Sequence, residues 1–138
     1  EDAKINTLQT NLSGIRSAVE TYYALHGHTY PGRNKTDSAG TTTTDEMAET
    51  AFKHQLTQYT NVNGLVQESK DSTYPFGPYI KGGGLPNNPF TNTNTLVCDY
   101  DEDKITIRNR TTTGSYAWKF FPITGVFIAN DTTEHSEM

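Results

Sequence analysis

The chain of 138 residues fits one ordinary domain with a single core, and it contains no apolar run long enough to cross a bilayer. Its 33% hydrophobic residues and 11 glycines give an apolar fraction of about 41%, below the roughly 45–50% that is usual for globular domains, so we expect a thin core. A net charge of −5 disfavours nucleic-acid binding, and a single cysteine, Cys98, excludes an intrachain disulfide and a zinc site made of several thiolates.

The first 25 residues show the clearest periodicity and predict a long amphipathic helix. Arg16 and Glu20 fall on the polar side, and Gly27 with the Pro31-Gly32 turn predicts where the helix ends. We favour packing of the apolar side on its own domain over a coiled-coil seam, because three heptads are few and the flanking positions lack paired charges. Apolar residues at steps of three and four form the packing stripe: Ile5, Leu8, Leu12, Ile15, Val19 and Tyr22.

Residues 33–44 are rich in threonine, serine and glycine and predict a mobile loop. We expect a second helix after it, because Thr43 and Thr44 supply a hydroxyl cap and Glu46 follows three residues after the first of them. About four helical turns fit before the turn at Asn63-Gly64. The predicted buried side of this helix consists of Met47, Ala51, Phe52, Leu56 and Tyr59.

Prolines and glycines dominate residues 65–90, which predicts an ordered meander in place of a helix or a central strand. Aromatic side chains punctuate this meander, and two roles are open to them. They pack on the long helix, or they contact a neighbouring subunit or a ligand. The four aromatic residues are Tyr74, Phe76, Tyr79 and Phe90.

The remainder of the chain carries strand patterns. Residues 96–98 and 104–108 flank an acidic turn, and residues 116–121 and 126–129 flank a turn that begins with Pro122 and ends with Gly125, so we predict two hairpins. A flexible acidic tail, residues 131–138, is expected after a globular domain of residues 1–130. The predicted fold class is therefore α+β, with a long N-terminal helix on a small antiparallel sheet, a second short helix and the aromatic meander.

Candidate catalytic and metal-ligating residues are few. His26 and His28 flank a glycine at the helix exit, but we favour a polar exit over a metal pair because no third ligand follows at a diagnostic spacing. The sequence contains no Gly-x-Ser-x-Gly motif and no nucleophile paired with a base, so we predict that the protein is not an enzyme. The densest set of oxygen ligands is the acidic turn, with Asp99, Asp101 and Asp103.

The spacing of these three aspartates is similar to the start of an EF-hand loop. Lys104 stands where the loop needs its turn glycine, and Arg110 stands where it needs a bidentate glutamate, so the EF-hand interpretation fails. A calcium loop of another kind and a solvated turn are both open, and we favour the solvated turn.

Three blocks of the chain resemble one known family. Residues 8–23, with a helix exit that ends in Tyr30-Pro31, are similar to the exposed half of the N-terminal helix of type II secretion pseudopilins and related type IV pilin-like proteins. The segments FGPYI (76–80) and LPNNPF (85–90) resemble the meander of the same proteins, and residues 117–130 resemble their closing hairpin. The blocks occur in the family's order and cover most of the chain.

The resemblance implies a pilin-like fold in which residues 1–26 are the exposed half of the N-terminal helix. It implies a soluble ectodomain whose apolar, membrane-inserted helix half lies before the sequence given. The protein would then be a structural subunit of a pseudopilus or a related pilus-like filament, assembled through that missing segment to support protein export. Implied partners are other copies, other pilins or pseudopilins, the secretion machinery and the inner membrane, and the implied location is the bacterial cell envelope, in the periplasm or outside the cell.

Two further points follow from the resemblance. The major pseudopilins carry a calcium site in the C-terminal loop region, which keeps Asp99, Asp101 and Asp103 as candidate ligands, although the family's ligand pattern is not matched residue by residue. The alternative function is a minor or tip pilin-like binding module that contacts a surface ligand or an exported protein through the aromatic residues of the meander.

Overall fold

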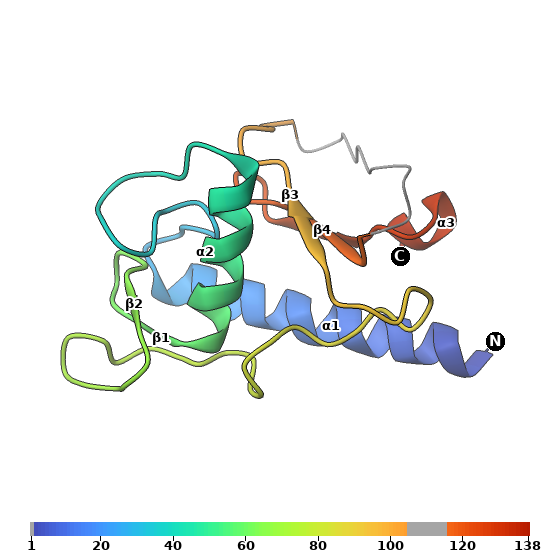
Figure 1. The fold of residues 1–138 in the computed structure, drawn as a ribbon, viewed down its shortest axis with the longest axis horizontal. Coiled ribbons are helices and arrows are strands. Elements are labelled where there is room, and N and C mark those ends of the chain that lie inside the picture. The colour runs from blue at the N-terminus through green and yellow to red at the C-terminus, as the bar shows by residue number, and fades with distance from the viewer. Residues whose placement is uncertain (1, 105–115) are drawn as a thin grey trace.

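The computed structural model describes residues 2–104 and 116–138 and confirms the α+β class (Figure 1). Within these residues the chain forms three helices and five short strands. In order, they are α1 (Asp2–Leu25), α2 (Asp45–Thr57), β1 (Tyr59–Thr60), β2 (Val66–Gln67), β3 (Leu96–Cys98), β4 (Trp118–Phe121), β5 (Val126–Ala129) and α3 (Thr133–Ser136).

Local chemistry predicts the end of α1 and the start of α2, but α2 ends at Thr57, so the assignment of Tyr59 to this helix is wrong and Tyr59 lies in β1. After α1, Gly27 adopts a left-handed conformation (φ 65°) and the backbone N–H of His28 donates to the carbonyl of Tyr23, 3.0 Å away, which closes the last turn. The hydroxyl of Thr44 caps α2 by accepting from the N–H of Met47 at 3.1 Å. In Figure 1, α1 runs along the length of the molecule.

The central sheet has the strand order β3-β4-β5. β4 and β5 pair antiparallel, with Phe120 opposite Phe127, and the backbone N–H of Gly125 closes their turn on the carbonyl of Phe121 at 2.7 Å, so the second predicted hairpin is confirmed. A separate two-stranded ribbon is formed by β1 and β2.

The prediction of a wholly antiparallel sheet is wrong for β3, which pairs parallel with β4 and has Leu96 opposite Trp118. A parallel neighbour needs a long connection, and residues 99–117 supply it. Most of the predicted partner strand, residues 104–108, lies outside the described residues.

The core lies between the helices and this sheet, where α2 packs against β3 and α1 packs against β5. Aromatic rings fill it: Phe52 of α2 lies 4.5 Å from Phe120 and 5.8 Å from Phe127, measured between ring centroids, and Trp118 lies 5.4 Å from Phe127. All four side chains are buried. A few large rings therefore supply much of the core of a chain with a low apolar fraction.

The C-terminal segment is packed in place of the frayed tail that the sequence predicts. The hydroxyl of Thr132 caps α3 by accepting from the N–H of His135 at 3.0 Å, and α3 contacts β5. His135 and Ser136 are buried. A short polar segment can be held in this way when its polar groups find partners inside the fold.

Candidate functional site

The side of α1 that faces the domain follows the predicted stripe. Leu8, Leu12, Ile15, Val19 and Tyr22 are buried, and Ala18 is buried beside them. Ile5 is half-buried and lies one turn nearer the helix start than Leu8, the first fully buried residue of the stripe. The first turn of α1 is therefore largely clear of the domain.

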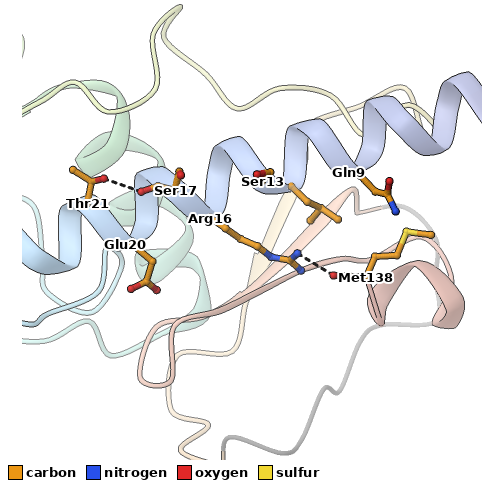
Figure 2. A pocket seen from close by; sticks show the side chains of 8 residues that line it. Gln9, Ser13, Arg16, Ser17, Glu20, Thr21 and Met138 are labelled. Carbon is orange, nitrogen blue, oxygen red and sulfur yellow. Dashed lines mark hydrogen bonds between the residues drawn. The ribbon is translucent and has the colours of Figure 1, made fainter.

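Arg16 joins α1 to the C-terminal half of the chain. Its Nε and Nη2 atoms donate to the carbonyl of Phe127, at 3.0 and 2.7 Å, and Nη1 donates to the carbonyl of Met138 at 3.0 Å (Figure 2). Sequence reasoning assigned Arg16 to the polar side and missed this role. Its place directly after the buried Ile15 was the available signal, because a long side chain at the edge of an apolar stripe can reach inward.

A shallow groove of about 650 Å³ runs beside Arg16 along α1. Its walls are mostly small or polar side chains of the helix, and Met138 forms the opposite edge (Figure 2). The residues that line it are Gln9, Leu12, Ser13, Arg16, Ser17, Glu20, Thr21 and Met138.

His26 is buried at the end of α1, and its two ring nitrogens are both engaged. Nδ1 lies 2.8 Å from the carbonyl oxygen of Tyr22, Nε2 lies 2.7 Å from the hydroxyl of Thr60, and the ring stacks on Tyr22 with centroids 3.6 Å apart. Burial lowers the pKa of His26, against a smaller opposing effect of the hydrogen bond to Tyr22. His28 is exposed and contacts Tyr23, so the structure gives these two histidines separate surroundings.

Gln55 is a buried polar link between α2 and two turns. Its Oε1 atom accepts from the backbone N–H of Gly32 at 2.7 Å, and its Nε2 atom donates to the carbonyls of Asn34 and Gly64 at 3.0 and 2.9 Å. Three bonds from one amide fix both turns relative to the helix, which offsets the cost of burying the group. No motif in the sequence singles it out.

Three aromatic residues of the meander, Phe76, Tyr79 and Phe90, pack against their own domain. Tyr74, Phe76, Tyr79 and Phe90 are each half-buried. Phe76 contacts the ring of His26 with centroids 5.0 Å apart, and Tyr79 meets Tyr22 edge-on at 5.9 Å. Burial raises the pKa of Tyr79 to about 12. These contacts support the packing role for the meander more than the binding role.

Asn88 and Phe90 connect the meander to the C-terminal segment. The Nδ2 atom of Asn88 donates to the carbonyl of Ala117 at 3.0 Å and to the carboxylate of Asp131 at 3.1 Å. That carboxylate also bonds His135, whose ring lies 4.4 Å from the ring of Phe90. The LPNNPF segment (85–90) resembles the meander of the family, but nothing in the sequence predicts that its side chains bond the C-terminal segment.

The acidic turn begins against α2. The backbone N–H of Cys98 donates to Glu49 and that of Tyr100 donates to Asp45, both at 3.0 Å. The pKa of Asp99 is raised, first by burial and then by the charges of Asp45 and Asp101, while Lys119 opposes the rise.

The three candidate calcium ligands differ in exposure, since Asp99 is half-buried whereas Asp101 and Asp103 are exposed. Across residues 2–104 and 116–138, no three histidine, cysteine, aspartate or glutamate side chains come together as a metal site. Calcium binding at the acidic turn stays a prediction.

Two further observations concern the reactivity of the Cys98 thiol and the ability of the helices to span a membrane. Cys98 is buried, and burial together with the charges of Glu49 and Asp45 raises the pKa of its thiol well above the ordinary value, which keeps the thiol protonated. None of the helices in the described part of the chain is both long and apolar enough to cross a membrane.

Comparisons with protein families, with curated proteins and with solved structures found no match for this chain.

Proposed function

We propose that this protein is the globular part of a structural subunit of a type II secretion pseudopilus or a related type IV pilus-like filament. The observation that supports the proposal is the length, burial and position of α1. Its 24 residues span about 36 Å at 1.5 Å per residue, one side of it is buried in the domain, and its N-terminal end lies at one end of the molecule (Figure 1).

The form of α1 suits a subunit that assembles through an extension of this helix. The buried stripe and the bonds of Arg16 attach α1 to β5, whereas the side chains of its first turn are mostly exposed. An apolar helical segment before residue 1 could therefore continue α1 and pack elsewhere without disturbing the domain. Its proposed partners are other copies, other pilins or pseudopilins, the secretion machinery and the inner membrane, with this domain in the periplasm or outside the cell.

The alternative, a tip module that binds through the meander, has less support. Phe76, Tyr79 and Phe90 all have ring contacts within the domain, so these surfaces are already used in packing. We include in the proposal that the protein is not an enzyme, and what supports this is that the sequence pairs no nucleophile with a base.

The encoding gene gives the direct test. We expect a prepilin cleavage site before Glu1, followed by an apolar run of about 20 residues. Expressed from its natural start, the protein should fractionate with the inner membrane and form filaments visible by electron microscopy, and deletion of the apolar run should leave a folded domain without filaments. A gene that begins without such a run contradicts the proposal.

A further inference from the structure

A small hollow lies where α1 ends, and we refer to it as the helix-exit hollow. Its volume is about 230 Å³, and it is lined on one side by Tyr23, His28, Thr29, Tyr30 and Arg33 and on the other by residues 122 and 123 of the hairpin turn. Tyr30 packs on the core through its contact with Phe120, but the proposed function assigns no role to the hollow itself.

The walls of the hollow are held by the local backbone and by packing. His28 adopts a left-handed conformation (φ 61°), which is uncommon for a residue other than glycine, and its ring lies 5.2 Å from that of Tyr23. Tyr23 stacks on Tyr30 at 4.2 Å. Tyr30 in turn lies directly over Gly125, where an added Cβ would be 2.2 Å from Cζ of the tyrosine. The aromatic wall is therefore fixed by the hairpin beneath it.

The charged group in this wall is Arg33. Its backbone is fixed by bonds to Tyr30 and Thr42, at 3.2 and 2.9 Å, and the residue as a whole is half-buried, yet among the described residues its side chain has neither a hydrogen bond nor an ion pair. The charge of Glu20 acts on Tyr30, but Glu20 forms no ion pair with Arg33 within the described residues. Among the residues that line the hollow, Arg33 is thus the one guanidinium, Thr29 and His28 add further polar groups, and none is a carboxylate.

We propose that the helix-exit hollow binds a carboxylate group, with Arg33 as the donor that recognises it. A guanidinium pairs with a carboxylate through two parallel N–H···O bonds, and the flanking rings shield such a pair from water more than an open surface does. Two ligands present the same carboxylate chemistry: a free small acid, and an acidic side chain of a second copy. A second copy offers many such side chains, because the chain carries 16 acidic residues against 11 basic ones.

The protein is titrated with sodium acetate, and NMR monitors the Arg33 Nε–H and the backbone amides of His28 and Thr29. A parallel titration with sodium chloride at equal ionic strength is the reference. We expect saturable shifts with acetate alone. Arg33→Gln should weaken the apparent affinity by about tenfold or more, because charge-assisted hydrogen bonds are lost. Lys35→Gln is the matched control, since it removes the same charge two residues away in a different hollow and should bind acetate as the wild type does.

Three results would overturn the proposal: shifts that match those in chloride, shifts that persist in Arg33→Gln, or an equal loss in Lys35→Gln. Unchanged amide shifts elsewhere show that both variants are folded. A second experiment, a protein-concentration series without acetate, tests which of the two sources supplies the carboxylate. If the same amides shift as protein concentration rises, a second copy supplies the carboxylate. If they do not shift although acetate binds, the second copy is excluded and a free acid is the source that the proposal retains. The proposal stands apart from the filament function, so either one can fail alone.

Discussion

At the residue scale, a small number of polar side chains carry long-range connections. Arg16, Gln55 and Asn88 each bond backbone groups from segments that are distant in the sequence. A typical net hydrogen bond stabilises a protein by about 1 kcal/mol, but a buried group left without its partner costs about 1–3 kcal/mol. Replacing one of these side chains therefore removes more than its own bonds, because the carbonyls or N–H groups that it satisfied lose their partner.

The buried histidine makes stability depend on pH in a defined direction. Because burial lowers the pKa of His26, the unfolded chain takes up a proton below about pH 6.5 more readily than the folded protein does. The stabilisation is present above that pH and is lost as the pH falls towards the folded-state pKa. We expect the free energy of unfolding, measured by urea denaturation, to fall between pH 7.5 and 5.5, and to fall less in His26→Gln.

The matched control is His28→Gln, which removes an exposed histidine two residues away and should keep the wild-type slope. The wild type and both variants carry the same carboxyl groups, so the protonation of these groups cancels when the pH dependences of the three proteins are compared. If the free energy of unfolding falls equally with pH in His26→Gln and the wild type, burial of His26 does not cause the pH dependence, whatever the absolute stability of the variant.

At the scale of elements, α1 is attached to the rest of the domain by its apolar stripe. Leu12 is 1% exposed in the middle of this stripe. Leu12→Asp removes a buried side chain, which alone costs about 2–5 kcal/mol, and places a carboxylate where it has no solvent. This approaches the whole stability of a typical domain, about 5–15 kcal/mol. We expect the variant to be unfolded or to melt far below the wild type in circular dichroism.

Gln9→Asp serves as the control, because it introduces the same carboxylate on the exposed side of the same helix. Its stability should stay within about 0.5 kcal/mol of the wild type. A wild-type melting temperature for Leu12→Asp would show that the stripe does not hold α1 to the domain.

The elements that could be predicted from the sequence are those specified by neighbouring residues. The cap at Thr44, the turn that ends at Gly125 and the spacing of the α1 stripe depend on positions a few residues apart. The parallel pairing of β3 with β4 joins residues 22 positions apart, as with Leu96 and Trp118, and no local pattern determines it. The bonds of Arg16 span 111 and 122 residues, so only the folded chain shows them.

At the scale of the whole molecule, acidic groups outnumber basic ones, and their mutual repulsion acts at the acidic turn. Asp45 and Asp101 act on Asp99 at the acidic turn, in a protein whose net charge is −5. A divalent cation would relieve this repulsion. If the turn binds calcium, a calcium concentration 100 times the Kd should stabilise the folded protein by about 2.7 kcal/mol, and removal of calcium by a chelator should lower the melting temperature.

Asp101→Asn combined with Asp103→Asn should abolish the effect of the chelator, while Glu68→Gln, at an exposed position in another loop, should preserve it. A melting temperature that calcium and the chelator leave unchanged in the wild type would identify the acidic turn as a solvated turn. The calcium prediction would then be wrong, with no consequence for the filament proposal.

The contact between α1 and β5 has a consequence for synthesis of the protein on the ribosome. The apolar stripe of α1 is synthesised well before its partner strand, because the carbonyl of Phe127 that Arg16 bonds follows 111 residues later. At the usual rates of translation, this delay is on the order of ten seconds. Contacts between residues so far apart in the chain also slow folding, because the intervening loop must close before they form. The nascent chain therefore exposes the apolar stripe of α1 until β5 has been synthesised, and during this interval the stripe is open to aggregation.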